Sequence, residues 1–511
     1  MPSIFETDAA LDTLAATAIT QTKELMAQSE KLRDRREKAS RKRVARLFKD
    51  PKAIEATITL TDEVMRISSV QSSSRIFRRA AKKASLVGFG AVNAFGLHFI
   101  GVLSRVVPGP IVGVVHQRVR ALSKDLILAS ESEKLSKHLA KRSTKGISLN
   151  INVLGEAVLG DHEAEQRFQS ILEMMRRPEV NYISVKLSSI VAQLIIIDVE
   201  GSITRVSEKM RILYREAQQH GVFVNLDMEE YRDLPMTVAA FMRVLDEAEF
   251  ESMKAGIVLQ AYLPEAHKFF AQLVEWSKAR YARSGGTIKV RLVKGANLAM
   301  ERAEAELHGW SSAPYRSKSD VDASYVRLVD AALRPEHSKA VRIGIASHNL
   351  FHMTWALEVA KSRGVVDQID IEMLEGMANA EALAVTRAGQ PVLLYAPVTR
   401  KDDFAAAVAY LVRRLDENTS DENYLKAAFE ISKNPAKFKE QEERFLKSIS
   451  ERHTITTESL RHVEHGLTTG HQFENERNAD PTEPEFISAV TKAIKKVRAI
   501  KDQEIPLVIN G

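Results

Sequence analysis

Two adjacent arginines, Arg413 and Arg414, stand in the stretch AYLVRRLDEN (409–418), which its pattern predicts to be helical. A guanidinium group presents its donors as a fixed fork, so the pair suits a carboxylate or a phosphate. Tyr410 precedes the pair by three and four residues, and Glu417 follows Arg413 by four, which places them on neighbouring helix surface. Most arginine pairs are solvated basic spots. The apolar residues around this pair, and the strand directly before its helix, favour a binding site instead.

Eight β-branched runs alternate with helical stretches from residue 146 onward, and they predict the elements that position the arginine pair. The runs are SLNINVLG (148–155), YISVKLS (182–188), VFVNLDME (222–229), GIVLQAYL (256–263), IKVRLVKG (288–295), VRIGIASHN (341–349), IDIEMLEGM (369–377) and VLLYAPV (392–398). Eight strand–helix units over about 280 residues match a parallel (β/α)8 barrel of the TIM type. The chemistry of such a barrel lies at the C-terminal ends of its strands.

The predicted strand ends carry polar side chains that would meet at one mouth of the barrel. They are Lys186, Asp227, Glu229, Gln260, Arg291, Lys294, Ser347, His348, Asn349, Glu375 and Tyr395. Each alone is as often a surface residue, but their joint position favours an active site. Arg291, Lys294 and the Gly295–Ala296 backbone suit a diphosphate or another anionic cofactor group, whereas the arginine pair with Lys186 suits a small carboxylate. We therefore expect an anionic cofactor beside an anionic substrate.

Composition excludes several kinds of site. The chain has no cysteine, which excludes disulfides, thiol nucleophiles and cysteine-ligated metals and favours a reducing compartment. No histidine–glutamate pair or carboxylate cluster has the spacing of a metal site, and Glu375 and Glu381 are interpreted as solvated side chains. The first residues, 1–14, lack the pattern of a secretory signal. A net charge of +6 permits contact with acidic membranes or nucleic acid without predicting it.

Four regions are predicted: a helical arm (1–50), a helical accessory domain (51–145), the barrel (146–430) and a C-terminal helical segment with a linker (431–511). The arm is expected to be one long helix from about residue 8 to 50. In the last region a linker (465–486) is expected before a further helix (486–501). The basic stretch 31–50 is interpreted as a solvated helix that packs on a neighbour, with a nucleic-acid or membrane arm as the alternative. Asp50 and Pro51 are expected at the start of a helix.

The run LVGFGAVNAFGLHFIGVL (86–103) contains no charged residue and reaches the length of a membrane-span candidate. Its four glycines, Asn93 and His98 argue against a span. A buried helical pair is favoured, and peripheral docking on a membrane remains an alternative.

Several segments together resemble the proline dehydrogenase family, as found in the bifunctional bacterial proline utilization A proteins. These are YISVKLSS, VNLDMEEYRD, IVLQAYL, KVRLVKGAN, ASHN, EMLEGM, LLYAPV and YLVRRLDEN, in this order. The terminal IPLVING (505–511) resembles the beginning of the aldehyde dehydrogenase half of those proteins, so we expect a natural protein to continue beyond it. No ribbon-helix-helix segment is present, so nucleic-acid binding is not expected.

The resemblance implies an enzyme that binds FAD in the barrel and oxidises L-proline to Δ1-pyrroline-5-carboxylate, the first step of proline catabolism to glutamate. It implies hydride transfer from proline C5 to flavin N5 and electron delivery to a membrane quinone. The expected location is therefore cytoplasmic, with peripheral association at the inner face of the cell membrane. The oligomeric state is not implied.

The resemblance also assigns roles to individual residues. Arg413, Arg414 and Lys186 hold the proline carboxylate, Tyr395 and Leu374 shape the wall around the ring, and Tyr410 packs nearby. Asp227 orients Tyr395 or Lys186, Glu417 orients the arginine pair, and Glu156 pairs with Arg413 as a gate. Asp227, Arg291, Lys186 and Tyr395 are expected to be catalytic. The FAD contacts are Met228, Gln260, Arg291, Lys294, Gly295, Ala296, Ser347 and His348.

One departure from the family pattern is Asn297, where an aromatic residue is usual after RLVKGA. Two other classes of function stay open. A Schiff-base aldolase on the same barrel would use Lys186 or Lys294 as its nucleophile. A non-enzymatic adaptor would use the basic N-terminal helix to bind a membrane or nucleic acid.

Overall fold

The computed structural model describes residues 4–6, 8–47, 49–67, 69–84, 86–155, 158, 160–400, 404, 407–408, 410–412, 423–461 and 478–500 of the 511-residue chain.

Eight parallel strands close into a barrel at the centre of the protein. Consecutive strands pair along the chain, and β9 pairs with both β8 and β2, which closes the ring. The strands are β2 (Ile147–Val153), β3 (Tyr182–Lys186), β4 (Phe223–Asp227), β5 (Ala255–Gln260), β6 (Ile288–Val293), β7 (Val341–Ala346), β8 (Ile369–Leu374) and β9 (Val392–Thr399). All eight predicted runs form these strands, so the predicted (β/α)8 barrel is confirmed. A short strand that the sequence did not predict, β1 (Leu128–Ala129), pairs with the end of β9.

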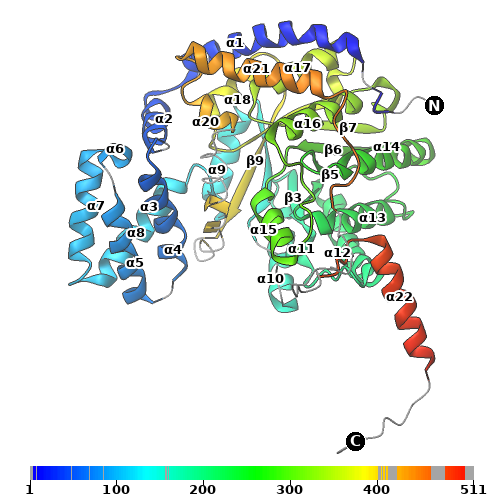
Figure 1. Ribbon diagram of the computed structural model, residues 1–511, viewed down its shortest axis with the longest axis horizontal. Helices are drawn as coiled ribbons and strands as arrows, with labels where there is room; N and C mark the ends of the chain where they lie inside the picture. The colour runs from blue at the N-terminus through cyan, green and yellow to red at the C-terminus, as the bar shows by residue number, and fades with distance from the viewer. Residues whose placement is uncertain are drawn as a thin grey trace, which may run out of the picture.

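The strands form where β-branched and other apolar residues are covered on both faces, as parallel strands require. All six residues of β5, for example, are buried. Helices surround the barrel (Figure 1). They are α10 (Asp161–Met175), α11 (Leu187–Ile190), α12 (Val199–His220), η2 (Tyr231–Asp233), α13 (Leu234–Leu245), α14 (Glu265–Ser284), α15 (Leu298–His308), α16 (Lys318–Ala332), η3 (Pro335–His337), α17 (Leu350–Ser362), η4 (Val366–Gln368) and α18 (Asn379–Arg387).

The expected single long helix over residues 8–50 is instead η1 (Ala9–Thr13), α1 (Leu14–Leu32) and α2 (Arg35–Leu47). The break lies at Arg33, whose backbone is extended with ψ 123°. Asp34 then accepts a hydrogen bond from the backbone N–H of Glu37 at 2.7 Å, which starts the next helix in the manner of an N-cap. The first helix is therefore free to pack on the barrel while the second leaves it. α2 has no buried residue, which agrees with the predicted solvated helix.

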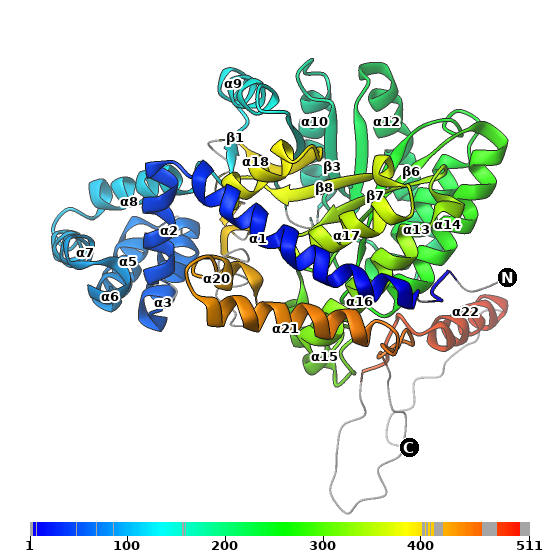
Figure 2. The same cartoon turned by 90° about the horizontal axis from the view of Figure 1, so that it is seen from above.

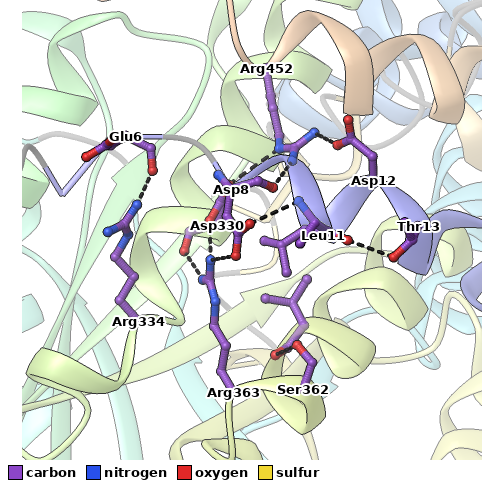
Figure 3. A network of polar contacts seen from close by, with 12 residues as sticks. Glu6, Asp8, Leu11, Asp12, Thr13, Asp330, Arg334, Ser362, Arg363 and Arg452 are labelled. Atoms are coloured by element: carbon purple, nitrogen blue, oxygen red, sulfur yellow. Dashed lines mark hydrogen bonds and ion pairs between the residues drawn. The ribbon is translucent and has the colours of Figure 1, made fainter.

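The N-terminal arm lies against α17 and α18, beside α21 (Pro435–Glu451), across one side of the barrel (Figure 2). A cluster of charged groups joins it to the helices there (Figure 3). Asp330 of α16 accepts from Arg363 at 2.7 Å and pairs with Arg452, just after α21, at 3.4 Å. Arg452 also pairs with Asp12 and donates to the carbonyl of Asp8 at 2.8 Å. Arg452 and Asp330 are fully buried, so this cluster fastens the start of the chain to α16 and to the end of α21.

A separate group of helices projects from the barrel (Figure 1). It contains α3 (Pro51–Thr61), α4 (Glu63–Arg66), α5 (Val70–Lys83), α6 (Leu86–Phe89), α7 (Ala91–Leu103) and α8 (Pro108–Ser123), and α9 (Ser132–Ser143) follows it toward the barrel. Asp50 caps α3 through the N–H of Lys52, with Pro51 in the first turn, as predicted. The expectation that run 86–103 is a buried helical pair is wrong in one respect. The run forms α6 and α7, but large apolar side chains of α7 are exposed because small residues make its inner contacts.

Three further helices follow the barrel: α20 (Tyr424–Ala428), α21 and α22 (Pro484–Ala499). α22 coincides closely with the predicted helix 486–501, and none of its residues is buried. Most of the predicted linker 465–486 and the stretch IPLVING lie outside the described residues. In the described part of the chain, no helix is both long enough and apolar enough to cross a membrane.

Candidate active site

A cavity of about 280 Å³ opens at the C-terminal ends of the barrel strands. Asn349 and Glu375, which were also expected at this mouth, do not line it, but the residues assigned a binding or catalytic role do line it where the structure describes them. They are Lys186, Asp227, Met228, Gln260, Arg291, Lys294, Gly295, Ala296, Ser347, His348, Leu374, Tyr395 and Tyr410. The other four, Glu156, Arg413, Arg414 and Glu417, lie outside the described residues, so their roles stay predictions. Because these residues lie at or just after the C-terminal ends of neighbouring strands, they surround one cavity although they are far apart in the sequence.

Arg291 occupies the floor of the cavity between two carboxylates. Its Nε donates to Glu372 at 2.6 Å and its Nη1 donates to Asp227 at 2.9 Å. Although burial opposes the charged form, Glu372 raises the pKa of Arg291 and Asp227 acts in the same direction, so the guanidinium stays charged. Its third nitrogen, Nη2, is buried without a hydrogen-bond partner among the described residues. A buried donor in this position is suited to an acceptor atom of a ligand in the cavity.

Below Arg291, the ion pairs continue into the interior of the barrel. Lys289, one pleat earlier on β6, lies 2.6 Å from Glu372 and 2.8 Å from Asp370. Arg342 then pairs with Asp370 at 2.6 Å near the opposite end of the barrel. We call the series Arg342, Asp370, Lys289, Glu372, Arg291 and Asp227 the charge ladder.

A glycine of β7 makes room for the charge ladder. A Cβ on Gly344 would lie 2.3 Å from a Glu372 oxygen and 3.0 Å from Lys289 Cε. TIM barrels usually fill this space with branched apolar side chains. Here the interior holds alternating charges, and any larger residue at Gly344 would displace them.

Asp227 joins the charge ladder to the wall of the cavity. The Tyr395 hydroxyl donates to Asp227 Oδ2 at 2.8 Å and accepts from Asn152 of β2. Burial and the Asp227 carboxylate both raise the pKa of Tyr395 well above its ordinary value, so the phenol keeps its proton. The role predicted for Asp227, to orient Tyr395 or Lys186, stays a prediction, and the hydrogen bond to Tyr395 is the contact that it would use.

Lys186 has a different partner. Its Nζ donates to Glu229 at 2.5 Å, and Ser188 donates to the other oxygen of that carboxylate. The loop after β4 brings Glu229 to Lys186, whereas Asp227 contacts Arg291 and Tyr395. Lys186 still faces the cavity, where it adds positive charge beside a carboxylate.

Lys294 lies at the end of β6 in a second polar cluster. Its Nζ donates to Asp322 at 2.6 Å and lies 3.0 Å from His352 Nδ1, and Lys318 pairs with the same Asp322. Burial lowers the pKa of Lys294 to about 7; Asp322 raises it and Lys318 lowers it further. The pKa of His352 is also well below its ordinary value, chiefly because the ring is buried and Lys294 is near. Lys294 therefore gains or loses its charge near neutral pH, and the charge of this part of the cavity changes with it.

The turn after Lys294 requires glycine. Gly295 has φ +126°, and a Cβ there would lie 2.4 Å from the Tyr262 ring. The backbone of Gly295 and Ala296 can therefore lie flat on Tyr262 while it lines the cavity. Asn297, the departure from the family pattern, donates to the carbonyl of Glu229 at 2.9 Å and so ties the loop after β6 to the loop after β4.

Two carboxylates that were predicted from the sequence to be solvated are buried. Glu375 pairs with Arg142 of α9, and Glu381 of α18 pairs with Arg33. The interpretation of both as solvated side chains is wrong, because arginines from distant helices cover them. No group of histidine and acidic residues suited to a metal ion occurs within the described ranges.

Sequence reasoning missed the residues that support the cavity from below. Asn152, Glu372, Lys289, Asp322 and His352 were not singled out. A period-two pattern of polar residues along the strands, as in Lys289 and Arg291 on β6, was the available signal for an inward-facing polar row.

A closed (β/α)8 barrel, with a cavity at its C-terminal mouth that is lined by three cations and three carboxylates, defines an enzyme of the TIM-barrel class. The family model described as proline dehydrogenase matches residues 135–427. The chain belongs to the proline dehydrogenase family.

Known relatives show how much of each protein is shared. Proline dehydrogenase 2 of Bacillus subtilis is 26% identical over 284 residues, which is 55% of this chain and 80% of that protein. The structure of proline utilization A from Corynebacterium freiburgense is similar with a TM-score of 0.65 and 44% identity, and covers 76% of this chain and 37% of that one. Proline utilization A from Bdellovibrio bacteriovorus, inactivated by N-propargylglycine, has the same fold with a TM-score of 0.76 and 23% identity over 95% of this chain. The chain covers 49% of that protein, so it spans less than half of either proline utilization A chain.

Proposed function

We propose that this chain is an FAD-dependent proline dehydrogenase that oxidises L-proline to Δ1-pyrroline-5-carboxylate and passes the electrons to a membrane quinone. Membership of the family supports proline oxidation. The observation that carries the cofactor is Arg291, a buried cation on the cavity floor with one nitrogen directed to no described protein acceptor.

The residues present fit an anionic flavin cofactor. The unpaired Arg291 Nη2 suits an electron-rich ring, since positive charge stabilises the negative charge that reduction develops. Lys294 and the Gly295–Ala296 backbone suit the diphosphate. Met228, Gln260, Ser347 and His348, which also line the cavity, complete the proposed FAD contacts. Bound FAD would supply, at its N5 atom, the acceptor for the hydride that leaves proline C5.

The chain itself would bind and orient proline. The proline carboxylate would pair with Arg413 and Arg414, with Lys186 nearby, and Glu417 would hold that pair in position. Tyr395 and Leu374 would enclose the ring, and Tyr410 would pack beside it. The buried surroundings favour the neutral amine, as they favour neutral Lys294, and a neutral amine is needed before the C5 hydrogen can leave with its electron pair. Glu156 would close over the substrate by pairing with Arg413.

An absorbance spectrum of the purified protein, recorded before and after addition of L-proline without oxygen, tests the proposal. A flavin band that L-proline bleaches, and that an equal amount of L-valine leaves intact, is the expected result. A colourless protein that does not take up FAD, or a flavin that proline fails to reduce, would contradict it.

A Schiff-base aldolase is supported by one observation, the lowered pKa of Lys294, since a neutral amine is the reactive form. Borohydride reduction in the presence of a small aldehyde or keto acid, followed by mass spectrometry, would attach the carbonyl carbon to Lys294 if this function were correct. We expect no such adduct, because the contacts of Nζ with Asp322 and His352 keep the amine from attacking a carbonyl carbon.

A further inference from the structure

The charge ladder is poorly explained by the stability of the barrel. A buried row of ion pairs is weak support for stability, because apolar residues of similar volume in its place are often as stable. TIM barrels usually fill this interior with such apolar residues. The ladder also requires glycine at position 344, where a Cβ would lie 2.3 Å from a Glu372 oxygen. The cavity that the ladder reaches therefore offers a better reason for its charges.

The six groups of the charge ladder cancel one another in charge. Three are cations and three are carboxylates, and neighbours in the series lie 2.6 to 2.9 Å apart. Burial opposes the ionised forms of Glu372, Lys289 and Arg291. Nevertheless, the two cations lower the pKa of Glu372, and Glu372 raises the pKa of each cation. These three groups therefore stay ionised, and carboxylates compensate the positive charge that Arg291 brings to the cavity.

Glu372 joins the cavity to the interior of the barrel. It lines the cavity, is 3% exposed, and pairs with Arg291 through Oε2 and with Lys289 through Oε1. Arg291 would stay fixed without this charge, because Asp227 accepts from its Nη1 at 2.9 Å. The guanidinium also lies 5.6 Å from the centre of the Tyr395 ring, within the range of a cation–π contact. Glu372 therefore changes how much net positive charge lies at the cavity floor, while other groups hold Arg291 in place.

We propose that Glu372 is a positioning residue that sets the reduction potential of the flavin, because its carboxylate compensates Arg291 at the floor of the cavity. The inference rests on the proposed function, in which FAD contacts Arg291. A nearby cation favours the reduced form of a flavin, which carries more negative charge, and a nearby carboxylate opposes it. The potential is therefore lower than an uncompensated Arg291 would make it, so the reduced cofactor gives up electrons more readily.

The reduction potential can be measured without proline and without turnover. The full chain would be purified with FAD and equilibrated with a reference dye of known potential while both are slowly reduced. Glu372→Gln keeps the shape of the side chain and removes one negative charge beside Arg291. We expect the equilibrium constant for two-electron reduction to increase about tenfold or more, which is a rise of about 30 mV or more in midpoint potential.

Asp370 provides the matched control. It lies two residues before Glu372 on β8, roughly 6.6 Å farther from the strand end. It belongs to the same ladder, pairs with Lys289 and Arg342, and does not line the cavity. Asp370→Asn therefore removes the same charge at a greater distance, and it should change the equilibrium constant by less than about threefold, because the energy between charges falls with distance. An equal rise in both variants would overturn the particular role of Glu372.

A change of opposite sign separates charge from disturbance of the barrel. Lys289→Met removes a cation next to Glu372 and should lower the equilibrium constant. Lys289→Met with Glu372→Gln removes one charge of each sign, so its constant should lie near that of the unchanged protein and about tenfold above that of Lys289→Met. The comparison of these two variants measures the Glu372 charge again if Glu372→Gln alone does not fold. A shift in the same direction in all three variants would overturn the proposal.

The outcomes distinguish this inference from the proposed function. If L-proline bleaches the flavin but Glu372→Gln has the potential of the unchanged protein, or a lower one, the role of Glu372 is overturned and the function stands. A chain that takes up no FAD would contradict the function, and the inference with it. A raised potential in Glu372→Gln with an almost unchanged one in Asp370→Asn is the result that supports the proposal.

Discussion

At the scale of residues, the cavity depends on how a few charges are shared. Asp227 binds both Arg291 and Tyr395, so one carboxylate positions a cation on the floor and a phenol on the wall. Lys186 is paired with Glu229 at the side. The positive charge that proline and FAD would need is therefore present but already oriented by carboxylates, which limits the reorganisation required on binding.

The arginine pair gives a direct test of substrate binding. Arg414→Met should raise the KM for proline about 100-fold or more, because the carboxylate loses a charged, bidentate partner. Flavin content should stay that of the unchanged protein. The KM for prolinamide, which lacks the carboxylate charge, should rise far less than the KM for proline. An equal rise for both compounds would show that Arg414 does not bind the carboxylate.

Lys294 predicts a pH dependence for cofactor binding. Its pKa is about 7 in the cavity, so the side chain is charged below that pH and neutral above it. A bound diphosphate stabilises the charged form and raises this pKa, so affinity should be constant below pH 7 and fall as pH rises, by at most about tenfold per unit. Titration of the apoprotein with FAD, followed by flavin fluorescence, measures this.

Two variants complete the titration. The Lys294→Met variant should bind FAD more weakly, and its affinity for FAD should not fall as the pH rises above 7. Lys318→Met removes a cation that lowers the pKa of Lys294, so the fall should begin at higher pH. A fall that persists in Lys294→Met would assign the dependence to another group.

At the scale of elements, the strands set the order of the charge ladder. Alternation along β6 places Lys289 and Arg291 on the same inward face, and Glu372 of β8 reaches both. Glu372 and Asp370 raise the pKa of Lys289 against the effect of burial, so the lysine stays charged. Glu372 thus joins β8 to β6, and these two strands are not neighbours in the barrel.

Breaking the ladder at one position should be costly. Lys289→Met leaves two carboxylates without their shared cation, and we expect it to lower the free energy of unfolding by about 3–5 kcal/mol. The double variant Lys289→Met with Glu372→Gln should regain about 1 kcal/mol or more, since one uncompensated charge is gone. Urea unfolding of the single and double variants gives these values, and simple addition of the two single effects would show that the pair is not coupled.

The strands could be predicted from sequence because β-branched runs of strand length recur between helical segments. The strand ends in turn indicated most of the cavity, including Arg291 and Tyr395. The partners of these residues could not be predicted. Nothing in the sequence around Glu372 shows that its carboxylate lies beside Lys289, because that contact depends on how the strands are aligned in the barrel. The burial of Glu381 could not be predicted either, because it depends on Arg33, at the break between α1 and α2.

At the scale of the whole molecule, the N-terminal arm is held by buried charges. Asp330 is the common partner of Arg363 and Arg452. Asp330→Ala should therefore cost about 3 kcal/mol of folding free energy, because a fully buried guanidinium loses a carboxylate. Denaturant unfolding measures the loss, and limited proteolysis should cut the arm first.

A surface pair serves as the control for Asp330. Arg215 and Glu249 are joined at 2.7 Å, but both are exposed. Arg215→Ala should leave unfolding and proteolysis unchanged, since exposed ion pairs contribute little. Equal effects of the two substitutions would mean that the buried cluster does not hold the arm.

The same cluster fixes the order of events during synthesis. Asp12 and Arg452 are 440 residues apart in the chain. At ribosomal speeds of 5–20 residues per second, roughly 20 to 90 s pass before the arm can meet its last partner. During that interval α1 can already pack on α17 and α18, which supply most of its contacts, whereas its contact with α21 and the pairing of Asp12 with Arg452 have to wait. The arm therefore docks on the barrel first, and the buried charges fasten it only when the end of α21 has been made.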